Sequence, residues 1–459
     1  MLGKLIDFDI TELIDEGNLN ELKMALGDLP SANLAEILSE VDPKKAIVVF
    51  RILPRDKAGN VFADLNREKQ EELLQSFSQE RLVAILENMP PDDRTQLFEE
   101  LPGKVTQRLM NLLSADQLRM ATQLLGYPED SVGRLMTPHY IMVKPHWSVE
   151  TALRHIRSFY SSAETASVVY VVDKDLKLVD DLKLAQIVVA SPNQKIGDLM
   201  DWNFVALRVD EDQEEAIGVF KKYYRFALPV VDSDGVLVGI VTLDDILAVA
   251  EEEATEDIHK IGGMESLDEP YASTPFWTLI RKRAGWLLVL FLSEMLTATA
   301  MGRFEEEIAR AVVLALFVPL IISSGGNSGA QAASLIIRAL AIGEISVKDW
   351  WRVMRREILS GLVLGFILGV VGFLRISIWS FFSDTYGPHW LLVGVTIWIS
   401  LIGVVLWGTL SGSLLPLLLK KIGLDPAVSS APFVATLVDV TGIVIYFEVA
   451  AIVLHGALL

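Results

Sequence analysis

The sequence predicts a multidomain membrane protein with an α-helical superhelical N-terminal domain, a tandem α/β module, an acidic connecting helix and a five-span α-helical transmembrane domain. Three observations predict this fold class: five long apolar stretches in the C-terminal part, a repeated proline-punctuated helix pattern in the N-terminal part, and two matching strand–turn–strand patterns between them. We expect the domains at 1–130, 131–249, 250–275 and 276–459.

Acidic residues are concentrated before the apolar stretches. The 459-residue chain has 60 Asp and Glu against 40 Lys and Arg. Residues 271–459 hold 11 acidic and 13 basic side chains, which leaves 49 acidic and 27 basic side chains in residues 1–270. This imbalance argues against nucleic acid as a partner and favours cations. The chain has no cysteine, which excludes disulfides, thiolate metal sites and a cysteine nucleophile.

Each apolar stretch is long enough to cross the ~30 Å hydrocarbon core of a lipid bilayer, which takes roughly 20 helical residues. The stretches lie near 279–301, 308–330, 358–382, 390–418 and 429–456. Basic loops before the first span, between the second and third, and between the fourth and fifth place these loops in the cytosol. We expect a multi-pass protein of the cytoplasmic membrane with a cytosolic N-terminus, without a signal peptide, and an outer C-terminus. Five spans per chain favour a symmetric homodimer.

The last apolar stretch contains a carboxylate in the segment ATLVDVTG. Asp439 lies about ten residues into this span, and Ala431 and Ala435 precede it on the same helix face. A charge at the bilayer centre costs roughly 2.5–3.5 kcal/mol and normally faces a polar cavity or a partner. We expect Asp439 and Ala435 to line an ion pathway. A structural aspartate that is protonated or paired is the alternative.

Three other charged residues fall within the predicted spans. Glu294, in the first span, would line either a dimer seam or the pore, and the sequence does not decide between them. Glu448 follows Asp439 by nine residues and points to a different side of the helix, so we interpret it as an interface residue. Arg375 lies near the outer end of the third span, where its side chain would extend to the membrane surface.

The segment SSGGNSGAQ (323–331) ends the predicted second span. Its three glycines, with Pro319 before them, predict a broken helix whose free carbonyl groups face a cavity, because irregular backbone is unstable against lipid. Gly325, Gly326 and Asn327 are therefore expected to line the pore. Small residues that only permit close helix packing are the alternative for each glycine.

A repeat organises residues 1–130. The segment DPKKAIVVFRILP (42–54) matches PPDDRTQLFEELP (90–102) at an offset of 48 residues. Repeated short helices of this kind stack into a superhelix with solvated charged faces. Asp92 and Asp93 follow two prolines at the start of one such helix, where carboxylates also act as caps.

Residues 171–187 and 230–246 share a pattern of strand, turn, strand and helix start at an offset of 59 residues. The second copy, LPVVDSDGVLVGIVTLDDI, resembles the cystathionine-beta-synthase (CBS) module, which works in pairs. The resemblance implies that Gly239, Thr242 and Asp245 match positions that hold ribose and phosphate in nucleotide-binding members. The first copy reads VDDLKLAQ there and lacks the glycine and the threonine. The support for ATP as a cofactor is therefore weak.

Residues 250–263, AEEEATEDIHKIGG, form a predicted acidic helix directly before the first span. Apolar residues recur on one face at helical spacing, and acidic residues occupy the other faces. The pairs Glu252–Glu256 and Glu253–Asp257 place like charges one turn apart, which destabilises an isolated helix by roughly 0.2–0.5 kcal/mol per pair. A solvated acidic face is the ordinary interpretation, but the position before the first span favours a helix that couples the soluble part to the membrane part.

The order of these parts resembles the MgtE family of magnesium channels and transporters along essentially the whole chain. The segments EEEATEDIHK, GGNSGAQ, GLDPA (423–427) and PFVATLVDVTG (432–442) carry the resemblance most specifically. It implies a homodimer with its pore on the two-fold axis and with Asp439 at the ion-selecting site. It also implies Mg²⁺-sensing carboxylates, which match Asp92 or Asp93, Asp212, Glu214, Asp245, Glu253, Glu256, Asp257 and Asp425. Ala330 departs from the polar or other small residue that many relatives carry.

The residues themselves favour Mg²⁺ as the ion. Mg²⁺ prefers six oxygen ligands and gives up water reluctantly, so one Asp439 from each subunit would recognise a largely hydrated ion. The six histidines are scattered, which disfavours zinc or copper. We expect a Mg²⁺-selective channel or transporter that imports Mg²⁺ and is closed by cytosolic Mg²⁺ bound to the acidic domains.

Two other functions are compatible with parts of the sequence. An ion-coupled secondary transporter of Mg²⁺, Co²⁺ or Mn²⁺ could use the same Asp439 and a broken second span. A membrane part that is a regulated enzyme or only a signalling anchor is the other alternative. An enzyme is not expected, because the sequence shows no nucleophile with its base, no phosphate-binding loop and no catalytic metal set.

Overall fold

The computed structural model describes residues 12–14, 16, 18–27, 29–160, 163–267, 271–272 and 274–456. The expectation about a signal peptide rests mainly on residues 1–11, which lie outside the described residues. The chain forms two compact units, Met1–Ala250 and Glu251–Leu459.

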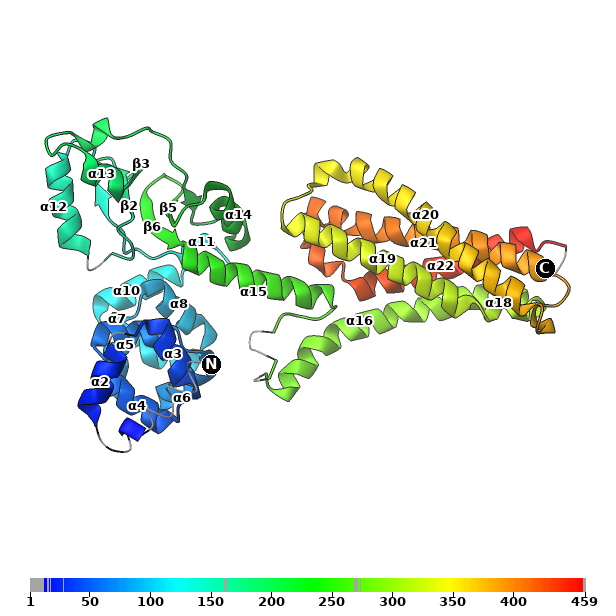
Figure 1. Cartoon of the computed structure of the whole chain (residues 1–459), viewed down its shortest axis with the longest axis horizontal. Helices are drawn as coiled ribbons and strands as arrows, with labels where there is room; N and C mark the ends of the chain where they lie inside the picture. Colours follow the sequence, from blue (N-terminus) through cyan, green and yellow to red (C-terminus); the bar gives the residue numbers. More distant parts are fainter. Residues whose placement is uncertain are drawn as a thin grey trace. The chain divides into compact units, whose positions relative to one another are not determined.

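Short helices build the N-terminal part of the first unit, as the repeat predicts (Figure 1). They are α2 (Leu19–Gly27), α3 (Ser31–Glu40), α4 (Pro43–Ile52), α5 (Arg55–Ala63), α6 (Arg67–Ser76), α7 (Gln79–Asn88), α8 (Pro91–Glu100), α9 (Gly103–Met110) and α10 (Ala115–Leu124). The two repeat copies, α4 and α8, are both ten residues long and both begin at a proline. Proline suits this first position because its ring fixes φ and its missing N–H has no partner there in any helix. Phe50, Phe62 and Phe77 meet edge-on or tilted in the apolar core beneath these helices.

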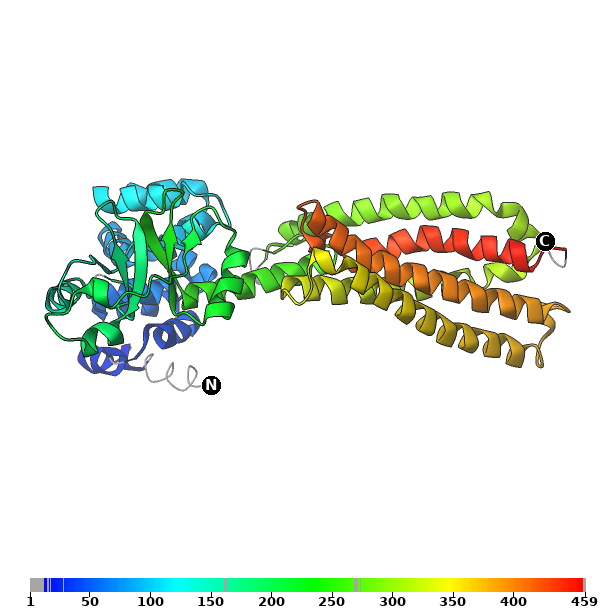
Figure 2. The same ribbon diagram turned by 90° about the horizontal axis from the view of Figure 1, so that it is seen from above.

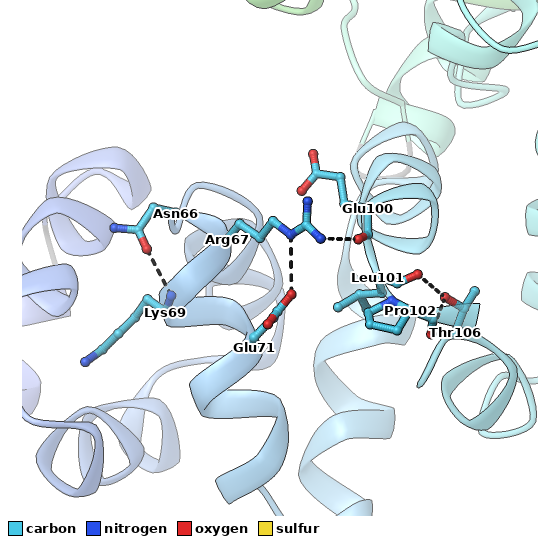
Figure 3. A network of polar contacts seen from close by, with 8 residues as sticks. All are labelled: Asn66, Arg67, Lys69, Glu71, Glu100, Leu101, Pro102 and Thr106. Carbon is cyan, nitrogen blue, oxygen red and sulfur yellow. Dashed lines mark hydrogen bonds and ion pairs between the residues drawn. The ribbon is translucent and has the colours of Figure 1, made fainter. Parts of the chain in front are cut away.

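Arg67 connects neighbouring helices of this part (Figure 3). Its guanidinium donates to the Glu100 carbonyl oxygen at 2.6 Å and to the Glu71 carboxylate at 3.3 Å. Thr106 donates its hydroxyl hydrogen to the Leu101 carbonyl oxygen at 3.2 Å. These bonds satisfy carbonyl groups at the C-terminal end of α8, which intrahelical bonds cannot reach. They fix the helix whose first turn carries Asp92 and Asp93.

Two small sheets follow in the first unit, with strand orders β1-β2-β3 and β4-β5-β6. The elements are α11 (Val132–Leu135), β1 (Met142–Val143), α12 (Val149–Phe159), β2 (Val168–Val172), β3 (Leu178–Lys183), α13 (Leu184–Val189), η2 (Ile196–Asp198), β4 (Leu207–Arg208), α14 (Gln213–Tyr223), β5 (Ala227–Val231), β6 (Leu237–Thr242) and α15 (Leu243–Ile261). In each sheet a parallel pair is followed by an antiparallel hairpin with a register shift at the same place. The tandem repeat is therefore confirmed as two copies of one fold.

The loss of the glycine in the first copy has a structural reason. Asp180 occupies the position that Gly239 holds in the second copy, and its side chain is fully buried. Its Oδ2 accepts the backbone N–H groups of Asp201 and Trp202 at 2.9 and 3.0 Å. The Asp180 carboxylate thus holds the backbone at Asp201 and Trp202, which leads toward the second copy. Its side chain fills the space that a glycine at this position would leave open.

Five helices of the second unit are long and apolar enough to span a membrane, within the part of the chain that the structure describes. Figure 2 shows them extended along one common direction. The elements are α16 (Phe276–Arg303), α17 (Glu305–Arg310), α18 (Val312–Ala315), α19 (Val318–Ala341), η3 (Val347–Asp349), α20 (Trp350–Trp379), η4 (Asp384–Tyr386), α21 (Trp390–Lys421), η5 (Pro426–Val428) and α22 (Ala431–Val453). α22 packs against α16, α19 and α21.

The predicted break at SSGGNSGAQ is wrong. α19 runs without interruption through this segment, which lies in the middle of the helix rather than at its end. Pro319 falls in the first turn of α19, where its missing N–H costs nothing. The irregular backbone lies before it, where Ala311 has φ −126° and ψ 67° between two short helices. The second span therefore extends to Ala341, about ten residues beyond the predicted boundary, and includes Arg338.

Close helix packing explains the glycines of α19. A Cβ atom built on Gly412 of α21 would lie 2.1 Å from the Gly329 carbonyl oxygen, and one built on Gly408 would lie 2.4 Å from the Gly325 carbonyl oxygen. The backbones of α19 and α21 can approach this closely only because no side chain separates them. The alternative of small residues that permit packing therefore accounts for Gly325 and Gly329.

Replacing Gly412 with alanine tests this contact. We expect Gly412→Ala to destabilise the membrane unit by roughly 1–3 kcal/mol, because the added methyl group forces α19 and α21 apart. The folded fraction that remains after heating in detergent, measured by gel filtration, checks this. The matched control is Gly302→Ala in α16, where an added Cβ meets no atom within 4 Å. Equal heat resistance of Gly412→Ala and the wild type would contradict the packing argument.

Candidate ion pathway and cation-sensing carboxylates

Asp439 lies on α22 beside the small residues of α19. A Cβ atom built on Gly326 would lie 3.3 Å from Asp439 Oδ1 and 3.4 Å from the Ala435 Cβ atom. Glycine at position 326 thus leaves space for the carboxylate between the two helices. Among the described residues, Asp439 has no hydrogen-bond partner and no ion pair. If it is ionised, an intramembrane carboxylate in this situation requires water or a cation as its partner.

Contacts at both ends hold α22 in place. Ser430 caps its N-terminus by accepting the Phe433 N–H at 3.3 Å, and Ser430 Oγ in turn accepts the Trp286 indole N–H at 3.1 Å. Near the other end, the Tyr446 hydroxyl donates to the Leu314 carbonyl oxygen at 2.9 Å. These bonds position the carboxylate on a rigid helix.

The other residues expected along the pathway lie on α19. Asn327 is exposed in the single chain, and its amide donates to Ser323 Oγ at 3.3 Å. Gly325 is buried against Val404 and Val438, at the contact of α19 with its neighbours. Gly326 faces the Asp439 carboxylate.

Asp425 and the end of α15 form a second group of charges in the same unit. Lys260 Nζ lies 2.7 Å from Asp425 Oδ2 and also pairs with the Glu256 carboxylate. Asp425 Oδ1 caps η5 by accepting the Ala427 N–H at 2.8 Å. Burial, and then the Asp425 carboxylate, raise the pKa of Asp257 above its ordinary value. This group therefore holds three carboxylates around one ammonium group.

The sequence predicted the acidic members of this group but not the lysine. Lys260 follows Glu256 by four residues, a spacing that itself indicates an ion pair along a helix. The contact with Asp425 crosses 165 positions of sequence, and no local pattern indicates it. Glu253 lies one turn before Glu256 on α15.

A third group of carboxylates lies in the first unit. Asp92 and Asp93, in the first turn of α8, act electrostatically on Asp245 of α15 and on Glu164. Burial, and then the neighbouring carboxylates, raise the pKa of Asp93 to about 7. Burial is also the largest cause that raises the pKa of Asp245, to about 6, and the pKa of Asp92 well above its ordinary value. Asp92 Oδ1 is inaccessible to solvent and has no hydrogen-bond partner.

Neither aspartate caps α8. The residue at the N-cap position is Pro90, and no side chain accepts a hydrogen bond there. The capping interpretation of Asp92 and Asp93 is therefore not supported. Asp64, Asp244 and Glu164 add to the negative potential around Asp93, and they were absent from the sequence prediction. Asp244 neighbours Asp245, but no sequence signal marks Asp64 or Glu164.

The remaining predicted residues have local structural partners. Asp212 caps α14 by accepting the Glu214 N–H at 2.8 Å. Thr242 directly precedes α15, and its N–H and hydroxyl both donate to the Asp245 carboxylate. A Cβ atom built on Gly239 would lie 2.7 Å from Met136 Sδ. Among the described residues, no three Asp, Glu or His side chains converge closely enough to enclose a bare metal ion.

Family comparisons cover most of the chain. A divalent cation transporter domain (MgtE) matches residues 318–449, an MgtE intracellular N domain matches 29–130, and CBS domains match 132–182 and 196–252. The magnesium transporter MgtE of Thermus thermophilus is 38% identical over 97% of this chain and 98% of its own length. The chain belongs to the MgtE family. The MgtE proteins of Bacillus subtilis and Enterococcus faecalis are 30% and 32% identical over 76% and 72% of this chain.

Two solved structures each resemble about half of this chain. The cytosolic domain of the Mg²⁺ channel MgtE in complex with ATP matches with 34% identity and a TM-score of 0.50, over 53% of this chain and 99% of that one. The soluble part of another magnesium transporter shares the fold, with 24% identity and a TM-score of 0.53 over 55% of this chain. These matches confirm the expected fold class of a helical MgtE N domain and a CBS pair, and the five apolar helices complete a multi-pass membrane protein.

The raised pKa values predict how stability depends on pH. The folded-state pKa of Asp93, about 7, lies above its unfolded value, so the stabilising contribution of its protonated form is present below about pH 4 and lost as the pH rises through about 7. In Mg²⁺-free buffer, Asp93→Asn should lose less stability than the wild type between pH 5 and pH 8, by on the order of 1 kcal/mol. Calorimetric melting of the full chain measures this.

The control for this experiment is Asp116→Asn, which changes a solvent-exposed aspartate of α10. It should follow the wild-type pH dependence. A wild-type pH dependence in Asp93→Asn would contradict the assignment of the raised pKa to this cluster.

Proposed function

We propose that the protein is a Mg²⁺-selective channel or transporter that imports Mg²⁺ across the cytoplasmic membrane as a homodimer, and that cytosolic Mg²⁺ closes it. The observation that carries the proposal is Asp439, a carboxylate at mid-span without a hydrogen bond or an ion pair among the described residues. The small residues Gly326 and Ala435 beside it let the carboxylate lie between α19 and α22. The names of the full-length relatives support Mg²⁺ as the ion.

The chemistry of Mg²⁺ suits a sparse site. Mg²⁺ holds its water shell tightly, so a pathway recognises it best through acceptors for the hydrogens of bound water. One carboxylate from each of two subunits supplies charge without removing that shell, and binding stays weak enough for release. The basic loops between the spans indicate that the N-terminus lies in the cytosol. The carboxylates around Asp93 and those around Asp425 would then face the cytosol as well.

Substitution of Asp439 tests the pathway. We expect Asp439→Asn to lower Mg²⁺ uptake into liposomes at least tenfold, because the neutral amide removes about 1.4 kcal/mol or more of attraction for the ion. A Mg²⁺-sensitive dye inside the liposomes measures uptake. Glu448→Gln is the control, since it neutralises another carboxylate of the same helix. Unchanged flux in Asp439→Asn would contradict the proposal, and uptake that requires a proton or Na⁺ gradient would favour the coupled transporter.

Gating follows from the two acidic groups outside the spans. When Mg²⁺ is scarce, the carboxylates around Asp93 and Asp245 repel one another, and protonation relieves this only in part. When Mg²⁺ is abundant, the ion bridges them and stabilises one arrangement of the soluble part. Glu253, Glu256, Asp257 and Asp425, beside the spans, would bind Mg²⁺ only after the first unit has bound it, because Lys260 pairs with Glu256 and Asp425 until then. Mg²⁺ that has entered the cytosol would thereby reduce further Mg²⁺ uptake.

An ATP site would rest on the second CBS copy in this chain. Thr242 donates two hydrogen bonds to the Asp245 carboxylate at the start of α15, so a nucleotide that binds these residues would have to replace those hydrogen bonds. In the first copy, Asp180 fills the position that corresponds to Gly239. Regulation by Mg²⁺ therefore does not require ATP in this proposal.

Removal of the first unit tests the gating. A chain that begins at residue 251 should import Mg²⁺ at a rate that no longer falls as internal Mg²⁺ rises, because the carboxylates of the first unit are gone. Uptake into liposomes preloaded with graded Mg²⁺ measures this against the full chain. Regulation that survives the deletion would contradict a sensor in residues 1–250.

A further inference from the structure

Two aromatic contacts set the register between α16 and α22. At one end, the Trp286 and Phe433 rings lie 6.2 Å apart between centroids. At the other end, the Phe304 and Phe447 rings stack at 5.1 Å. Trp286 precedes Phe304 in the sequence, and their partners Phe433 and Phe447 follow each other in the same order. α16 and α22 therefore run side by side in the same direction.

This register places Glu294 level with Asp439. Glu294 lies a little less than half way from Trp286 to Phe304, and Asp439 lies at the same fraction of the way from Phe433 to Phe447. Both intervals are helical and rise ~1.5 Å per residue, so equal fractions correspond to equal depth. The two carboxylates are also close enough to interact electrostatically.

The side of α16 that carries Glu294 is marked by Thr297. Thr297 is the one residue of α16 whose side chain is buried, with 9% of its surface exposed. It therefore identifies the side of α16 that packs against the other helices. Glu294 precedes it by three residues, which places it beside Thr297 on the helix surface, and its side chain is exposed in the single chain. The Thr297 hydroxyl oxygen is inaccessible to solvent and has no hydrogen-bond partner in the protein.

Neither carboxylate has a counter-charge. Within the described part of the chain, Glu294, like Asp439, has no hydrogen bond and no ion pair. A charged side chain that faces lipid at this depth costs roughly 2.5–3.5 kcal/mol. Two unpaired carboxylates at one depth also repel each other. A hydrated divalent cation removes both penalties, since it supplies positive charge and water hydrogens.

We propose that Glu294 is a second carboxylate of the ion pathway, which recognises the hydrated divalent cation together with Asp439 at the level where α16 faces α22. This rests on the proposed function, in which Asp439 lines the pathway. The pathway then carries two carboxylates per chain instead of one. The added charge attracts a divalent ion twice as strongly as a monovalent ion at the same distance, so Glu294 determines selectivity as well as affinity.

Uptake by charge variants tests the proposal. The full chain is placed in liposomes that hold a Mg²⁺ chelator and dye, and initial rates are measured against external Mg²⁺ with and without excess K⁺. We expect Glu294→Gln to raise the half-saturating Mg²⁺ concentration about tenfold, or about 1.4 kcal/mol, and to make uptake more sensitive to K⁺. Glu294→Asp should restore most of the affinity. Glu448→Gln is the control that neutralises a different intramembrane carboxylate.

The outcomes separate the two proposals. If Glu294→Gln matches the wild type while Asp439→Asn loses uptake, the role of Glu294 is wrong and the proposed function stands. If Asp439→Asn also keeps wild-type uptake, the proposed pathway itself is wrong. Gel filtration shows whether each variant folds, and Glu294→Ala removes the charge for the same test if Glu294→Gln is unstable.

A single cysteine gives a second measurement, because the chain has no cysteine of its own. In intact cells, a membrane-impermeant thiol reagent should modify Glu294→Cys, and external Mg²⁺ should slow the reaction severalfold relative to K⁺ at matched ionic strength. Leu292→Cys, on the opposite face of α16, is the control and should stay unmodified. Mass spectrometry of the purified protein measures the modification. A Glu294→Cys reaction as slow as the control, or one unaffected by Mg²⁺, overturns the proposal.

Discussion

The cost of an uncompensated carboxylate away from bulk water is the constraint on which the rest of this structure depends. Asp439 has no partner among the described residues, although it lies at the middle of a membrane-spanning helix. In the first unit, burial, and then neighbouring carboxylates, raise the pKa values of Asp93 and Asp245 to about 7 and 6. Each arrangement stores repulsion that a divalent cation relieves.

Rigid packing maintains this repulsion. Asp439 lies beside α19, so its position depends on where α19 is held. Gly408 and Gly412 of α21 contact α19 without any side chain between the two helices, and this close contact keeps α19 in place. The capped start of α22 and the contacts of Phe433 and Phe447, toward its two ends, with rings of the Trp286–Phe304 segment fix the depth of Asp439. Glycine therefore acts here as a packing residue that stiffens the membrane unit, and a carboxylate held by stiff helices keeps its affinity for a cation.

The carboxylate of Asp425, unlike that of Asp439, is compensated by a cationic side chain of the protein. There the chain supplies its own cation, because the Lys260 ammonium group pairs with both Asp425 and Glu256. An ammonium group and Mg²⁺ satisfy the same carboxylates, but the lysine is tied to α15 whereas Mg²⁺ exchanges with the cytosol. The ammonium group compensates this group only in part, since three carboxylates surround it, whereas Asp439 has no cationic side chain beside it among the described residues.

The sequence by itself determined the architecture, because its signals are local: apolar length for the five spans, the 48-residue and 59-residue offsets for the soluble repeats, and the unusual position of Asp439 in an apolar stretch. The resemblance to the MgtE family pointed to Asp92, Asp93, Asp245 and Asp425, which the structure places in two groups of carboxylates. Only the tertiary structure decided the state of α19, since glycines that read as a helix break are instead required by the approach of α21. Only it placed Lys260 against Asp425 and Glu294 level with Asp439. These pairs are far apart in sequence, and their proximity depends on the packing of whole helices, which no local pattern encodes.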